Sequence, residues 1–144
     1  MTAQYEGEAN ARAQMETIRE ACEAWQTLID ARRNENEEIP VAFDGSTYEE
    51  AGDLQDAIHE FPLSVNFRSG WVASWSDMEI EEYRITLTTG GPECRIVGEI
   101  GEGDPALQWK DWGTGWQTLH VDPHTDDGRA LAWFAGFFTD LMSG

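Results

Sequence analysis

Carboxylates are the commonest side chains in this sequence that can do chemistry, and cations do not balance them. The 144 residues include 28 Asp and Glu but nine Lys and Arg, a formal net charge of −19 at pH 7. Carboxylate pairs catalyse proton transfer, but with so many present no spacing selects a catalytic pair. The segment between Arg33 and Arg68 contains no Lys or Arg. Its acidic residues are Glu35, Glu37, Glu38, Asp44, Glu49, Glu50, Asp53, Asp56 and Glu60.

Unopposed carboxylates repel phosphate and attract strongly basic surfaces, of which nucleic-acid-binding sites are the commonest in a cell. Duplex DNA carries one charge per roughly 1.7 Å, so the net charge of −19 matches about 32 Å of duplex. A folded chain of this length is about 37 Å across, a similar dimension. We therefore expect the nine acidic residues to contact a basic nucleic-acid-binding protein or complex, and we expect no direct binding of nucleic acid or membranes. The alternative is that acidity only confers solubility, or reflects a halophilic or GC-rich source.

Other chemical motifs are weaker. His120 and His124 have a spacing that brings two imidazoles near one metal, but Pro123 interrupts any helix between them. Residues 89–92 (Thr-Gly-Gly-Pro) lie between alternating segments, which favours a hairpin turn over an anion-binding loop. Cys22 and Cys94 have no metal or redox spacing, so reduced thiols are expected. The sequence therefore predicts no catalytic residue, no metal and no cofactor, and favours a binding protein over an enzyme.

A group of tryptophans provides candidate aromatic anchors for a partner. Trp109, Trp112 and Trp116 are close in sequence and surround Lys110. Indole rings stack on sugars or unpaired bases, and they also anchor protein interfaces. The net charge opposes nucleic acid, whereas a carbohydrate or a protein partner stays open. The alternative is that these rings pack where a sheet meets a helix.

A long amphipathic helix is predicted over residues 1–33, because no Gly or Pro occurs between Ala9 and Arg33. Apolar residues recur there at helical spacing: Met15, Ile18, Cys22, Trp25 and Ile29. This stripe packs on the chain's own sheet, the usual case, or pairs with its copy in a homodimer through residues 9–33. Residues 34–45 are predicted to form an acidic loop.

A short acidic helix is predicted to follow from Ser46, since Ser46 and Glu49 have the spacing of a capping box. One face of this helix is apolar, and it ends before Pro62. Its other face carries Glu49, Asp53, Asp56 and Glu60 at helical steps, with Glu50 beside them. The sequence therefore predicts a solvent-exposed acidic ridge.

The remaining chain predicts a sheet and a closing helix. Apolar and polar residues alternate over 63–68, 83–88 and 95–100, and further strands are expected at 106–112 and 116–121. Short turn sequences between the segments favour antiparallel neighbours. Residues 125–141 predict an aromatic helix, capped by Thr125. The expected fold class is α+β: a single domain in which an antiparallel meander of four to five strands packs with three helices.

Several motifs over about residues 60–118 resemble a known family. They are Pro62-Leu63-Ser64-Val65, Arg68-Ser69-Gly70-Trp71, Tyr83-Arg84-Ile85, Thr89-Gly90-Gly91-Pro92, Arg95-Ile96, Gly98-Glu99, Trp109 and Asp111-Trp112-Gly113-Thr114. This order is similar to that of small acidic proteins of unassigned function encoded on bacterial plasmids and phages. The resemblance implies a setting in which such proteins disarm CRISPR surveillance complexes or restriction enzymes, and it implies no catalytic residue.

The expected function is therefore a cytoplasmic anti-CRISPR or antirestriction inhibitor that acts as a DNA mimic. No stretch approaches the length of apolar sequence needed to span a bilayer. Two alternatives stay open. One is a small enzyme with His59 or His120 beside a carboxylate in a cleft. The other is a structural or self-associating protein whose acidity is incidental.

Overall fold

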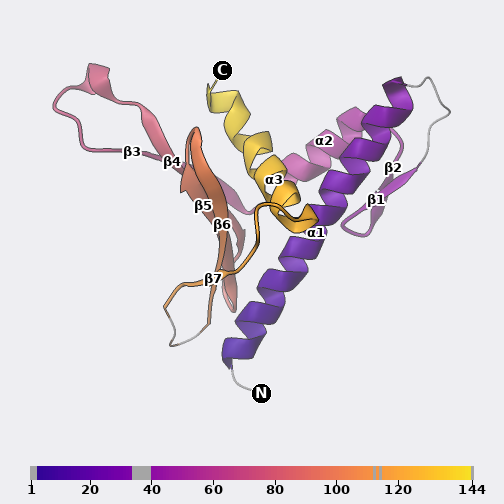
Figure 1. Cartoon of the computed structure of the whole chain (residues 1–144), viewed down its shortest axis with the longest axis horizontal. Helices are drawn as coiled ribbons and strands as arrows, with labels where there is room; N and C mark the ends of the chain where they lie inside the picture. Colours follow the sequence, from indigo (N-terminus) through magenta and orange to yellow (C-terminus); the bar gives the residue numbers. More distant parts are fainter. Residues whose placement is uncertain (1–2, 34–39, 112, 114, 144) are drawn as a thin grey trace.

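A five-stranded antiparallel sheet lies to one side of three helices in the computed structural model of the chain (Figure 1). The structure describes residues 3–33, 40–111, 113 and 115–143. Glu35, Glu37, Glu38 and Trp112 therefore lie outside the described residues. The α+β class predicted from the sequence is confirmed.

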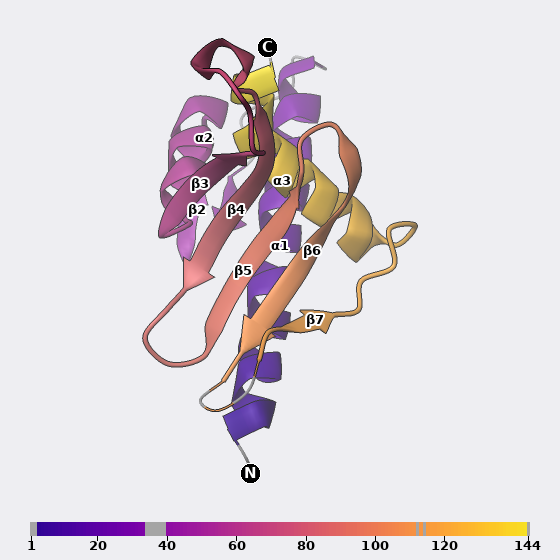
Figure 2. The same ribbon diagram turned by 90° about the vertical axis from the view of Figure 1, so that its left-hand side faces the viewer.

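The sheet consists of β3 (Ser64–Ser69), β4 (Ile80–Thr88), β5 (Glu93–Glu99), β6 (Glu102–Lys110) and β7 (Gln117–Leu119). These strands are hydrogen-bonded in sequence order, and each pair is antiparallel, as the predicted meander requires. Alternation places Ile85, Ile96 and Leu107 side by side on the buried inner face. The polar residues between them face outward, and Figure 2 shows this outer face toward the viewer.

Helix α1 (Ala3–Arg33) contributes its apolar stripe to the chain's own core. Met15 and Ile18 are buried as predicted, while Cys22 and Trp25 are partly buried. The most deeply buried line also includes small residues, namely Ala11, Ala21 and Ala24, which permit close approach. The stripe thus packs within the chain, and a homodimer through residues 9–33 stays a prediction.

The segment before the second helix differs from the sequence prediction. β1 (Val41–Phe43) and β2 (Ser46–Tyr48) form a hairpin, so residues 41–43 are not part of an acidic loop and the helix does not begin at Ser46. Asp44 and Gly45 have positive φ angles of 49° and 82°, the conformation that an Asp-Gly hairpin turn requires. Val41 and Phe43 are buried, which makes the hairpin part of the core.

Helix α2 (Ala51–Glu60) starts four residues later than a capping box at Ser46 implied. Its N-cap is Glu50, whose side chain makes no capping hydrogen bond. The predicted Ser46 and Glu49 capping box is therefore wrong, because Ser46 belongs to β2. Ala51, Leu54 and Ile58 form the buried face of α2, as the apolar spacing predicted.

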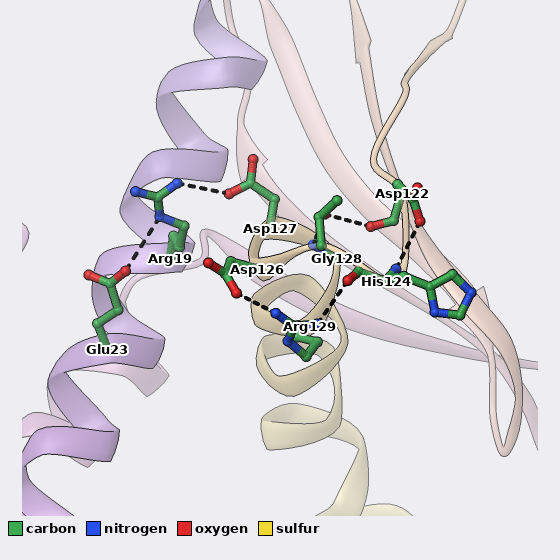
Figure 3. A network of polar contacts seen from close by, with 9 residues as sticks. Arg19, Glu23, Asp122, His124, Asp126, Asp127, Gly128 and Arg129 are labelled. Atoms are coloured by element: carbon green, nitrogen blue, oxygen red, sulfur yellow. Dashed lines mark hydrogen bonds and ion pairs between the residues drawn. The ribbon is translucent and has the colours of Figure 1, made fainter.

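Helix α3 (Asp126–Ser143) carries the aromatic residues that complete the core, among them Phe134 and Phe138. Thr125 caps it, because its Oγ1 accepts a hydrogen bond of 3.2 Å from the N–H of Gly128. Arg19 of α1 joins the two helices through an ion pair of 3.3 Å with Asp127 (Figure 3). No helix in the described part of the chain combines the length and apolarity needed to cross a membrane.

Candidate partner-binding surface

The hairpin turn and α2 present the predicted acidic residues to solvent. Six of the nine lie in the described residues, and all six are exposed: Asp44, Glu49, Glu50, Asp53, Asp56 and Glu60. We refer to these six residues as the acidic surface. Since Ala51, Leu54 and Ile58 turn toward the core, the carboxylates of α2 face away from it. Asp53, Asp56 and Glu60 thus form an exposed ridge on α2 as predicted, whereas Glu49 and Glu50 are exposed but precede the helix.

The turn of the hairpin is attached to the first helix by a hydrogen bond. The backbone N–H of Asp44 donates to Oε1 of Glu20 at 2.6 Å. Glu20 is itself exposed, so this contact brings a seventh carboxylate from α1 next to the acidic surface. A charge-assisted bond to a backbone N–H stabilises the turn in this position.

Cations are absent from the acidic surface and present elsewhere in the described structure. Four of them lie on successive strands of the sheet, namely Arg68, Arg84, Arg95 and Lys110. The ion pairs of the described residues involve acidic residues outside the acidic surface: Arg12–Glu8, Arg19–Glu23, Arg19–Asp127, Arg68–Glu82, Lys110–Glu93 and Arg129–Asp126. Among the side chains that the structure describes, none of these ion pairs includes a carboxylate of the acidic surface.

The three candidate anchor tryptophans do not form one platform. Trp109 is only 6% exposed in the core, so a partner cannot reach its ring, and its assignment as an anchor is wrong. Trp112 lies outside the described residues. Trp116 is half-buried, with the guanidinium carbon of Arg95 3.7 Å from its ring centroid. The burial of Trp109 was predictable from strand alternation, because Trp109 follows the buried Leu107 at a step of two and so lies on the same face of the sheet.

A different pair of tryptophans is available to a partner. Trp71 and Trp75 have exposed fractions of 105% and 89%, and both lie in the connection between β3 and β4. We refer to residues 70–79 as the β3–β4 arm, and Figure 1 shows that it projects away from the rest of the fold. Val72 and Met78 are exposed in the same segment. Sequence reasoning missed this arm. Its two tryptophans lie between turn sequences, where strand alternation stops, and this pattern could have indicated exposed aromatic residues.

The arm is acidic as well as apolar. Asp77 and Glu79 are its charged residues, and it contains no Lys or Arg. At its base, Arg68 of β3 forms an ion pair with Glu82 of β4. The arm thus has the same sign of charge as the acidic surface, with apolar side chains added.

Asp122, His124 and Asp126 make contacts at the start of α3. The backbone N–H of His124 donates to Oδ1 of Asp122 at 2.9 Å, and Asp126 pairs with Arg129 (Figure 3). These contacts stabilise the first turn of α3, so the residues have a structural role there. Within the described residues, no group of three or more His, Cys, Asp or Glu side chains is arranged to hold a metal ion.

Neither the thiols nor His59 forms a reactive cluster in the described structure. Burial raises the pKa of the Cys94 thiol from 9.0 to about 12, which suppresses the nucleophilic thiolate. The pKa of Cys22 is also raised, first by burial and then by the charge of Glu23. The ring of His59 lies 4.7 Å from that of Phe137, centroid to centroid. Its nearest ring neighbours are therefore aromatic side chains of α3.

Comparison of the chain with protein-family models, curated proteins and solved structures gave no match. The assignment of a function therefore depends on the geometry and charge of the surfaces described above.

Proposed function

We propose that this chain is an inhibitory binding protein whose acidic surface occupies the basic nucleic-acid-binding site of a host complex. The observation that carries the proposal is the group of six exposed carboxylates that no cation of the described structure pairs with. The resemblance over about residues 60–118 gives the proposed setting. It is anti-defence activity of a mobile element, anti-CRISPR or antirestriction, in the cytoplasm.

Electrostatics provides the recognition in this proposal. Concentrated carboxylates attract a cationic groove before contact and accelerate the encounter, and salt weakens this attraction. The six carboxylates lie between residues 44 and 60, on the hairpin turn, on the two residues before α2 and on α2 itself, so they would meet the partner as a unit. They would then compete with a polynucleotide for the same arginines and lysines.

The β3–β4 arm provides apolar anchors for the same complex. Exposed tryptophans that become buried at an interface contribute a large share of the binding energy. Trp71 and Trp75 take the role first assigned to Trp109, because their rings are free to enter a pocket of the partner. Charge and aromatic contacts act together in this proposal, because charged residues contribute more to specificity and association rate than to affinity.

The test is capture of purified CRISPR surveillance complexes and restriction enzymes by the tagged protein at low and high salt. We expect capture of one such complex at low salt, loss of capture at high salt, and competition by its DNA or RNA. The combined change Glu49→Gln, Asp53→Asn, Asp56→Asn and Glu60→Gln should abolish capture.

The matched control removes the same charge elsewhere, through Glu6→Gln, Glu16→Gln, Asp30→Asn and Asp104→Asn, all at exposed positions. This control should retain most of the capture. Equal loss in both variants would mean that only net charge matters, and full capture by the first variant would exclude the acidic surface as the contact.

A further inference from the structure

A shallow groove lies on the outer face of the sheet, away from the helices. Its volume is about 640 Å³, and residues of β3, β4, β5 and β6 line it. Among its polar side chains are Asn66, Arg84, Arg95 and Gln108. Arg68 also lines the groove, and in a chain with a net charge of −19 three arginines in one groove require an explanation.

The guanidinium group of Arg95 is held in a fixed orientation. Its Nε donates a hydrogen bond of 2.9 Å to Oε1 of Gln108, the cross-strand partner of Arg95. Its Cζ lies 3.7 Å from the ring centroid of Trp116, which stacks against it. These contacts leave the two terminal amino groups without a hydrogen-bond partner among the described residues. A guanidinium fixed in this way is pre-organised for an anion.

Arg84 adds a second positive charge nearby. Thr86 of β4 pairs with Arg95 across the sheet, and Arg84 lies two residues before Thr86, so the two arginines are diagonal neighbours. The pKa of Arg95 is lowered, first by burial and then by the charge of Arg84, while Glu93 partly offsets this. Glu93 itself pairs with Lys110 at 3.3 Å. No carboxylate in the described residues forms an ion pair with Arg84.

Each of the two amides of the groove accepts one hydrogen bond. Oε1 of Gln108 accepts the bond from Arg95, and Oδ1 of Asn66 accepts one of 3.4 Å from Oγ of Ser64. Each residue also has an N–H₂ group that can donate. Asn66 is the cross-strand partner of Arg84, as Gln108 is of Arg95. The groove therefore offers two guanidinium groups and two amide donors.

We infer that Arg84 and Arg95 form a binding site for a phosphate group, with Asn66 beside Arg84 and Gln108 beside Arg95 at opposite margins of the site. Two monocations match the charge of a phosphate dianion, and guanidinium groups bind phosphate oxygens in pairs. Arg68, Glu82 and Glu99 line the groove in the cross-strand row next to Arg84, and Arg68 and Glu82 pair with each other. The group comes from free inorganic phosphate or from a small phosphate monoester, and the groove has the size of small-ligand pockets.

The test is calorimetric titration of the full chain with inorganic phosphate at low ionic strength, in a chloride buffer without phosphate. We expect saturable binding to one site, and about a tenfold or greater loss of affinity in Arg84→Gln and in Arg95→Gln. Arg12→Gln is the matched control, because it removes the same charge from an exposed position on α1, on the other side of the sheet from the groove. This control should keep the wild-type affinity.

A second titration with glycerol phosphate distinguishes the two sources of the group. Tighter binding than that of inorganic phosphate identifies an organic monoester, and equal or weaker binding identifies free phosphate. Absence of saturable binding of both probes to the wild type, or an equal loss in all three variants, would overturn the proposal. Circular dichroism of each variant establishes that the fold is intact.

Discussion

The backbone N–H of Gly7 donates a hydrogen bond of 3.0 Å to Oδ2 of Asp111, a buried carboxylate 104 residues further along the chain. This bond attaches the beginning of α1 to the end of β6. The close approach requires glycine, since a Cβ at position 7 would lie 2.6 Å from Oδ2 of Asp111 and 2.6 Å from Cε3 of Trp109. Position 7 therefore determines how the long helix lies on the sheet.

We predict that Gly7→Ala lowers the free energy of unfolding by about 1 to 3 kcal/mol, because the added methyl group overlaps Trp109 and Asp111. Gly52→Ala in α2 is the matched control, since a Cβ there has no neighbour within 4 Å. The control should raise stability by about 0.5 to 1 kcal/mol, as alanine is the better helix former. Urea unfolding followed by circular dichroism measures both. Changes of the same sign would contradict the steric account.

Thr125→Ala should lower the free energy of unfolding by about 1 kcal/mol, because the N–H of Gly128 loses its hydrogen-bond acceptor at the start of α3. Thr125→Ser keeps the oxygen and should retain most of the stability. The measurement is again the urea midpoint. Equal destabilisation by both variants would show that the methyl group of Thr125, and not its hydroxyl, is responsible.

Alkaline pH should destabilise the protein through Cys94. Its folded pKa of about 12 lies above the ordinary value of 9.0, so the folded state retains a proton that the unfolded state releases. The stabilisation from this group is complete below about pH 9 and decreases as pH rises toward 12, by up to about 1.4 kcal/mol per pH unit. Urea unfolding between pH 8 and about 11 measures the slope, which should be smaller in Cys94→Ala. An unchanged slope in Cys94→Ala would show that Cys94 is not the cause of the alkaline destabilisation.

The double change Trp71→Ala and Trp75→Ala should leave the free energy of unfolding within about 0.5 kcal/mol of the wild type, because both rings are exposed. The same variant should lose capture of the partner complex. Trp109→Ala provides the contrast, with an expected loss of about 3 to 5 kcal/mol from the core. Thermal melting and the capture assay together distinguish the two roles. Destabilisation by the arm variant would show that these rings are structural.

Much of the sheet was predictable because strand alternation is a local property of the sequence. Tyr83, Ile85 and Leu87 are buried in register, and their neighbours are more exposed. The start of α2 was not predictable in the same way, since Ser46 and Glu49 fit a capping box equally well. Burial of Val41 and Phe43 in the core favours the hairpin instead, and that is a tertiary contact.

The acidic part of the candidate site was predictable, and the aromatic part was not. Carboxylates are exposed almost wherever the fold leaves them unpaired, so the spacing along α2 was enough to place them. Tryptophan is common both in cores and at interfaces, and composition does not separate the two. Trp109 is buried because it continues the inner face of β6, while Trp71 and Trp75 belong to a connection with no partner layer.

The contact between Gly7 and Asp111 also constrains how the chain is assembled during synthesis. A ribosome makes Gly7 first, and Asp111, which accepts its hydrogen bond, follows 104 residues later. The hairpins of the meander join neighbours in the sequence and have no such delay. Completion of the fold around the nascent N-terminal segment therefore has to wait until β6 and Asp111 have left the ribosome.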